Sequence, residues 1–470
     1  MTTLRLPQEA AELTVRAAAA MLTVFAAFVA VKMGAQIGFG LVLLLCFFAL
    51  AVLGFLLAPH WTIALMIPLF AFIPAAKVFV SPAIGPLKDI VALAAIVAAV
   101  AVLVLERSHG RTRPALDRWV LLSVGLLLGL YVVNVGGGHG LAWAQGLRLM
   151  AEPFLLLVVG LTLDKAARTL RFAGVSLILT AAVAAGYGLV QQAVGKWALV
   201  GWGYSFTSQV RSYNGHLRSF GTFDDPFAYA AFILFGLAAL IFLRRRGTVP
   251  LALFSLFLLG LAVSYVRTAA LILVALGGLW LARKGFGSSS LLVIAAAAAA
   301  MGAILVTAAG ATQTQTYATG SSTLTLNGRT SAWKAALGRP SEWPFGRGVG
   351  AVGTAAYRTS YTLVPGPNVK PASRAVDSGY LATITDVGLF GVAVLLALFG
   401  RLLVLAYDGI RRGRDAAWFA AAMIIVLMLD AVTRSSFTGF PTAFLGLLLI
   451  GVALAAASEA DRSPAPPLAP

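Results

Sequence analysis

One carboxylate and two glycines have a spacing that could serve chemistry at the end of a hydrophobic segment. Asp377 and Ser378 stand where the longest polar segment of the chain meets an apolar run, and Gly388 and Gly391 follow within that run. At about 100° per residue, a helix starting at Ser378 places both glycines on the side of Asp377. The acid would then lie above a groove of small residues. Close packing between membrane helices is the alternative reason for the two glycines.

Basic side chains accumulate near the predicted outward ends of hydrophobic segments. A charge embedded in a membrane costs about 2.5 to 3.5 kcal/mol, so a functional cavity is the expected reason for it. Arginine is suited to bidentate contact with phosphate, which indicates an anionic substrate. The candidate substrate contacts are Lys196, Arg211, Arg218, Arg267, Arg329 and Arg434. For Lys196, a position in the membrane interface is an alternative explanation.

Other motifs that could carry chemistry are weak. The run from Gly348 to Gly353 has the glycine spacing of a dinucleotide fingerprint but follows no predicted strand of a βαβ unit. The four histidines are scattered without the spacing of zinc ligands. Asp224 and Asp225 precede a proline, which favours a helix cap over a cation site. We expect neither a metal nor a cofactor.

The composition predicts which elements must position these residues. Of 470 residues, 60% are hydrophobic and 11% charged, and apolar runs of membrane-spanning length recur along the chain. This pattern predicts an all-α polytopic membrane protein, because helices satisfy their own backbone groups in lipid. The formal charge of +18 is dispersed over the joints between runs, so we expect a lipid bilayer and no nucleic acid as partner. The single Cys46 can form no internal disulfide.

Hydropathy predicts about fourteen transmembrane helices, with an uncertainty of about two. The predicted spans are 16 to 33, 37 to 58, 60 to 79, 88 to 105, 117 to 135, 147 to 164, 170 to 194, 224 to 243, 249 to 265, 267 to 282, 288 to 309, 378 to 402, 415 to 433 and 438 to 457. With fourteen spans, five basic joints and both termini fall on the same side of the membrane, which the positive-inside rule makes cytoplasmic.

The predicted organisation has a central core between two groups of helices. Transmembrane helices occupy residues 1–194, the core occupies 195–402, and further helices occupy 403–457. The core contains a large extracytoplasmic loop, 310–377, and the Pro/Ala-rich residues 458–470 are expected to form a disordered cytoplasmic tail.

Four short runs occur in an order that resembles the O-antigen ligase and polymerase superfamily. They are Arg218-Ser-Phe-Gly-Thr-Phe-Asp-Asp-Pro226, Ser264-Tyr-Val-Arg-Thr268, Arg329 to Trp333 followed by Pro344-Phe-Gly-Arg-Gly-Val-Gly350, and Asp377-Ser378 to Gly388-Leu-Phe-Gly391. The resemblance implies a fold like that of C-type membrane glycosyltransferases. It also implies metal-independent transfer of a glycan from undecaprenyl diphosphate, on the outer face of the bacterial plasma membrane. Arg218 and Arg267 match the arginines that contact the diphosphate in that family.

One departure from the family pattern affects the expected activity. Asp377 stands where the ligase branch has a histidine, although the nine-residue gap to Gly388 is kept. A carboxylate can also act as general base for a sugar hydroxyl, so the resemblance favours a polymerase of oligosaccharide repeat units. Asp386 would lie on the opposite face of the helix, as a buried polar contact.

Two alternative activities stay open. A ligase would attach finished glycan to a lipid or wall acceptor, and a flippase would move lipid-linked oligosaccharide across the membrane. The charges are biased toward the outer side and no internal repeat is evident, which favours an enzyme over a transporter. Besides the undecaprenyl-diphosphate-linked oligosaccharide, a chain-length regulator protein is a further candidate partner.

Overall fold

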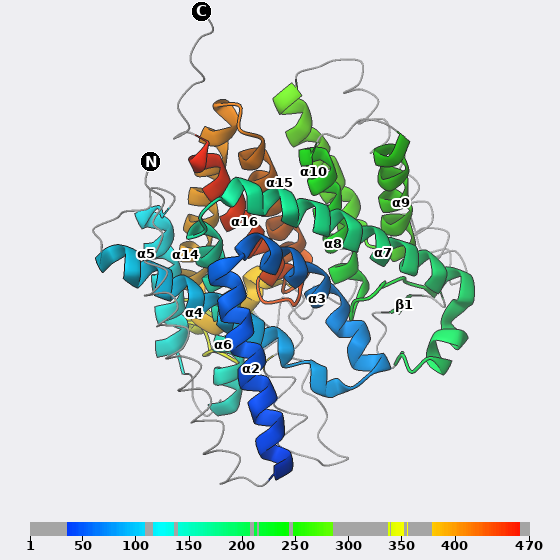
Figure 1. Cartoon of the computed structure of the whole chain (residues 1–470), viewed down its shortest axis with the longest axis horizontal. Coiled ribbons are helices and arrows are strands. Elements are labelled where there is room, and N and C mark those ends of the chain that lie inside the picture. Colours follow the sequence, from blue (N-terminus) through cyan, green and yellow to red (C-terminus); the bar gives the residue numbers. More distant parts are fainter. Residues whose placement is uncertain are drawn as a thin grey trace, which may run out of the picture.

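The computed structural model describes residues 35–108, 116–135, 140–206, 211–213, 216–243, 248–284, 337–338, 340–351, 355 and 378–460. Its helices are α2 (Ala35–Leu57), α3 (Pro59–Phe79), α4 (Leu87–Ser108), α5 (Arg118–Val133), α6 (Gly140–Leu161), α7 (Ala166–Gly201), α8 (Pro226–Leu243), α9 (Thr248–Ser264), α10 (Arg267–Lys284), α14 (Gly379–Arg411), α15 (Asp415–Thr433) and α16 (Thr442–Glu459). Short 3₁₀ turns occupy Pro82–Ile84 and Pro340–Glu342, and the two short strands are β1 (Ser212–Tyr213) and β2 (His216–Leu217). Figure 1 shows these helices gathered into one bundle.

Eight of the described helices are long and apolar enough to cross a membrane, which makes the chain a multi-pass membrane protein. The described parts of α2, α5, α9 and α10 add shorter apolar helices. Large apolar side chains such as Val104, Leu179 and Leu271 are more than half exposed, as expected for a surface that faces lipid. The predicted spans 16 to 33 and 288 to 309 lie outside the described residues.

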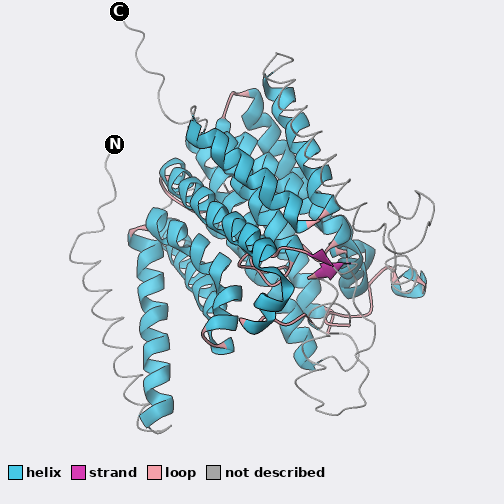
Figure 2. Cartoon of the chain, turned by 90° about the vertical axis from the view of Figure 1, so that its right-hand side faces the viewer, coloured by secondary structure: helices cyan, strands magenta, loops and turns pink. Residues whose placement is uncertain are grey.

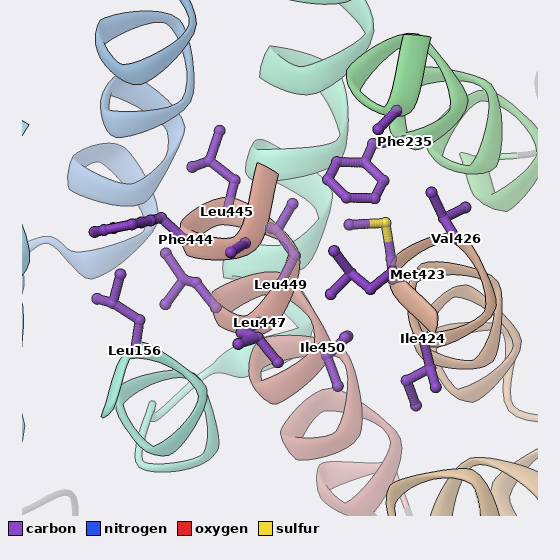
Figure 3. Close-up of a cluster of buried hydrophobic side chains, with 14 of the residues drawn as sticks. Leu156, Phe235, Met423, Ile424, Val426, Phe444, Leu445, Leu447, Leu449 and Ile450 are labelled. Atoms are coloured by element: carbon purple, nitrogen blue, oxygen red, sulfur yellow. The ribbon is translucent and has the colours of Figure 1, made fainter. Parts of the chain in front are cut away.

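The core of the bundle is built around α16. In its membrane-length window 89% of the residues are buried, against 33% in α14, so α16 is central and α14 peripheral. Figure 3 shows Leu445 and Leu449 of α16 among apolar side chains of α6, α8 and α15. A helix that is apolar on all sides belongs in such a position.

Small residues bring α6 and α16 into backbone contact. A Cβ atom at Gly160 would lie 2.4 Å from the carbonyl oxygen of Leu448, and one at Gly451 would lie 2.3 Å from that of Leu157. Glycines at helix crossings allow this approach in membrane proteins. The contact fixes α6 against the central helix.

Two of the long helices bend at glycines. The backbone of α7 departs from helical geometry at Gly195, with φ 77°, and that of α14 at Gly388, with φ 75° and ψ −170°. The prediction of a regular helix from residue 378 to 402 is therefore wrong at Gly388. Below the bend, α14 continues to Arg411.

The bend in α14 receives the segment 343–347. The backbone N–H of Leu389 donates to the carbonyl of Trp343 at 2.7 Å, and that of Arg347 donates to Thr385 at 2.6 Å. A Cβ atom at Gly388 would lie 2.2 Å from the carbonyl oxygen of Pro344. Gly388 thus serves the docking of this segment onto α14.

A small hairpin lies between α7 and α8. β1 pairs antiparallel with β2, with Ser212 opposite Leu217. Figure 2 shows these strands at the edge of the helical bundle. Directly after β2, the backbone N–H of Ser219 donates to the carbonyl of Val263 in α9 at 3.0 Å, which attaches this segment to the end of α9.

Candidate functional site

A buried glutamine holds the segment that carries Arg218. Gln191 of α7 is fully buried, and its side-chain oxygen accepts from the backbone N–H groups of Phe220 at 3.0 Å and Gly221 at 2.9 Å. Its amide nitrogen donates to the carbonyl of Gly221 at 2.9 Å. Because Gln191 satisfies three backbone groups, the turn after Arg218 keeps one conformation.

Arg218 connects two of the runs on which the family resemblance depends. Its Nε donates to the carbonyl of Ser264 at 3.3 Å, and its guanidinium lies over the ring of Phe227 at 4.7 Å. Ser264 is the last residue of α9, and Arg267 is the first of α10. Tyr265, between them, has φ 51°, a left-handed conformation that makes the joint tight. Arg218 is therefore fixed against the joint that presents Arg267.

Arg211 lies on an aromatic surface close to Arg218. Its guanidinium is 4.2 Å from the ring centre of Phe220 and 5.4 Å from that of Tyr204. Its Nε donates to the backbone carbonyl of Asp224 at 3.0 Å, and its own carbonyl accepts from the backbone N–H of Arg218 at 3.0 Å. Burial lowers the pKa of Arg211 while the nearby carboxylates act in the opposite direction, and the group stays cationic at neutral pH.

Lys196 lies at the edge of the same aromatic surface. Its ammonium is 5.6 Å from the ring centre of Phe206, and that ring is 6.2 Å from the ring of Phe220. The ammonium is also 5.5 Å from the ring of Trp197, whose side chain is 80% exposed. An exposed tryptophan beside a lysine suits a membrane interface, the alternative explanation for Lys196.

The two aspartates before α8 have different roles. The Asp225 carboxylate accepts from the backbone N–H of Ala228 at 2.7 Å, which confirms the predicted helix cap. The Asp224 carboxylate pairs with Lys77 of α3 at 2.9 Å. The second oxygen of Asp225 faces Arg434 at 3.5 Å, so the cap also holds a cation.

Arg434 follows α15 directly and is more buried than Lys77, the other cation that forms an ion pair with this segment. Its side chain is 14% exposed and lies 3.6 Å from the Asp430 carboxylate, which is itself nearly buried. Asp430 also accepts from the hydroxyl of Ser436 at 2.5 Å. Within the described part of the chain, Nη1 of Arg434 has no hydrogen-bond partner. This buried nitrogen is the one that faces Asp430 at 3.6 Å, so it belongs to that ion pair.

The start of α14 packs directly on Arg434. The backbone N–H of Gly379 donates to the carbonyl of Arg434 at 2.8 Å, and the Ser378 hydroxyl donates to that of Ala431 at 3.3 Å. Asp377 precedes Ser378 in the chain and, like Arg329, lies outside the described residues. The structure thus brings the segment after Asp377 to the end of α15.

The predicted site residues fall into two groups. Arg211, Arg218 and Arg434 belong to one set of contacts with the residues around Asp224 and Asp225, Arg267 adjoins this set, and Lys196 lies at its edge. Gly388 and Gly391 lie elsewhere in α14, and the space beside Gly391 is filled by the side chain of Val387. Their surroundings are those of packing positions.

Two contributors to this site were not identified from the sequence. Gln191 is a polar residue within an otherwise apolar predicted span, and that contrast is the signal that could have indicated it. Lys77 lies near the outward end of a predicted span, and nothing in the sequence indicates that it holds Asp224. Comparison with protein-family models and with curated proteins finds no match for the chain.

Proposed function

We propose that this protein is a membrane glycosyltransferase that polymerises oligosaccharide repeat units carried on undecaprenyl diphosphate, on the outer face of the bacterial plasma membrane. The supporting observation is the meeting of sequence-distant cations around one short segment, 218–226. Arg218 contacts the joint before Arg267, Arg211 contacts Asp224, and Arg434 contacts Asp225. Of the four runs on which the family resemblance rests, the run 264–268 contacts this segment directly, and the start of the run that ends at Gly391 packs on Arg434, which pairs with Asp225.

The reaction is a displacement at the anomeric carbon of the donor sugar. An acceptor hydroxyl oxygen forms the new glycosidic bond, and the bond from the anomeric carbon to the diphosphate oxygen breaks. The proton of the acceptor hydroxyl goes to the carboxylate of Asp377. The leaving group is an undecaprenyl diphosphate anion, which needs stabilisation of charge and no general acid.

The arginines are suited to that stabilisation. Negative charge increases on the diphosphate in the transition state, and donors fixed in advance stabilise it without reorganising. Arg218 and Arg211 are held by backbone carbonyls, and Arg434 by two carboxylates. Arg267 and Arg329 are the further candidate contacts, and no metal ion is needed in this mechanism.

The test is transfer by purified protein supplied with an undecaprenyl-diphosphate oligosaccharide. We expect a ladder of lengthening glycans on a gel, lost in Asp377→Asn and in Arg267→Ala while both variants stay folded. Arg168→Ala is a matched control, because Arg168 lies over Phe172 at the start of α7, on the predicted cytoplasmic side, and should leave the ladder unchanged.

Other results would select the alternatives. A single shifted product that requires an added lipid acceptor would identify a ligase. Movement of the donor across a proteoliposome membrane, with no glycan product, would identify a flippase and refute the enzyme. A full ladder of glycans made by Asp377→Asn would show that Asp377 is not the general base.

A further inference from the structure

A second polar site lies inside the bundle, between α14, α5, α6 and the segment after α15. It is a cavity of about 30 Å³, whose polar lining consists of Tyr131, Thr383, Asp386, Ser435 and Thr438. Such a volume holds one or two particles of the size of a water molecule. Asp386 was predicted as a buried polar contact, and in the structure its accessible surface faces this cavity.

The two threonine hydroxyls of the cavity direct their hydrogens to backbone carbonyls. Thr383 donates to the carbonyl of Gly379 at 2.9 Å, and Thr438 donates to that of Ser435 at 3.3 Å. These side chains therefore offer the cavity oxygen lone pairs, which are acceptors and cation ligands.

Asp386 adds a carboxylate to this set. One of its oxygens accepts from the backbone N–H of Gly350 at 3.3 Å. Among the described residues no lysine or arginine forms an ion pair with it, in contrast to Asp89, Asp117 and Asp430. The charged form of this carboxylate is costly inside a membrane protein without a counter-charge, so a bound cation would stabilise it.

We propose that this cavity binds a dehydrated monovalent metal cation, with sodium as the ion of matching size. Hard cations take oxygen ligands, which is what the cavity presents. One carboxylate neutralises a monovalent ion, whereas a divalent ion would leave an uncompensated charge in the bundle. The lining joins α14 and α5 to Ser435 and Thr438, so the bound ion ties the segment after Arg434 to the peripheral helices. This inference does not rest on the proposed glycosyl transfer.

The test uses thermal unfolding of the purified full chain in detergent, at a fixed alkaline pH. Sodium chloride is compared with choline chloride at equal ionic strength. We expect sodium to raise the unfolding midpoint of the wild type by about 2 °C or more, and the rise to grow with sodium concentration. Asp386→Asn should lose this response and should be at least as stable as the wild type in choline, because it no longer buries a charge.

Two threonines of α14 supply a matched pair of variants. Thr383 and Thr385 both donate to the carbonyl four residues earlier, and only Thr383 lines the cavity. Thr383→Val should weaken the sodium response, and Thr385→Val should keep it. Equal midpoints of the wild type in sodium and choline, a sodium response retained in Asp386→Asn, or absence of stoichiometric ²²Na⁺ binding to the wild type would each overturn the proposal.

Discussion

Replacement of Arg434 by glutamine, alone and combined with Asp430→Asn, separates the structural role of Arg434 from its proposed catalytic role. Arg434 faces Asp225 at 3.5 Å and Asp430 at 3.6 Å. The Asp430 side chain is only 3% exposed, whereas that of Asp225 is 27% exposed and can be hydrated. Removing the cation therefore leaves one buried carboxylate without a counter-charge, and this loss costs about 3 to 5 kcal/mol of stability.

The effect on transfer should be of similar size but of different origin. Loss of one preorganised donor to a developing anion lowers kcat by roughly 10² to 10³. Arg434→Gln alone would mix this effect with unfolding. The double variant Asp430→Asn/Arg434→Gln removes the buried charge together with its partner, so most of the lost stability should return. Its transfer rate should stay low, because the cation is still absent.

The assay combines thermal unfolding with the rate of glycan elongation for the wild type, the single variant and the double variant. Arg434→Lys is a further comparison, because it keeps the charge but loses the planar set of guanidinium donors. We expect about a tenfold loss of the elongation rate in this variant. A double variant that is stable and elongates glycans at the wild-type rate would refute the assignment of Arg434 to the diphosphate. Its role would then be only to neutralise Asp430.

Two further predictions concern the framework. Gly388→Ala should lower the free energy of unfolding by about 2 kcal/mol or more, because the φ and ψ angles at Gly388 suit only glycine and a Cβ atom there would strike Pro344. The control is Gly400→Ala in the same helix, which has open space beside it and should be neutral or slightly stabilising. Both variants are measured by urea titration. The hydrogen bond from Arg401 and those from backbone N–H groups lower the pKa of Asp117. The pair of Asp117 and Arg401 therefore stabilises the fold above about pH 4. This contribution is lost as the pH falls through the pKa of Asp117 in the folded state. In Asp117→Asn the free energy of unfolding should depend less on pH in the acid range. The same pH dependence as in the wild type would show that the pair contributes nothing.

The helices could be predicted from the sequence because runs of high hydropathy mark where each of them lies. The predicted spans coincide with the described helices α2 to α10 and α14 to α16, with larger errors at some ends. Helix α6 begins at Gly140 rather than at residue 147, since Gln145 and Arg148 lower the local hydropathy without ending the helix. The predicted span for α7 ends at residue 194, one residue before the bend at Gly195. In the structure the helix resumes after this bend and continues to Gly201.

The pairing of the charged residues could not be predicted in the same way. Arg434 and Asp225 are 209 residues apart, and Lys77 and Asp224 are 147 apart. Neither contact leaves a local pattern, because each depends on which helix ends meet in the folded bundle. Sequence reasoning therefore identified Arg211, Arg218 and Arg434 as candidates but could not assign their partners. For Asp224 and Asp225 it favoured a helix cap over a cation site and gave no indication of their basic partners.

The carboxylates among these cations change what the site can do. A cluster of arginines alone would repel itself and hold any anion, including the released diphosphate, tightly. Here Asp224 holds Lys77, while Asp225 and Asp430 hold Arg434, so part of the positive charge is already compensated. The remaining donors are fixed in direction, and fixed donors favour the state in which the negative charge is largest. Such an arrangement would suit the proposed transfer, in which the leaving diphosphate must be stabilised and then released.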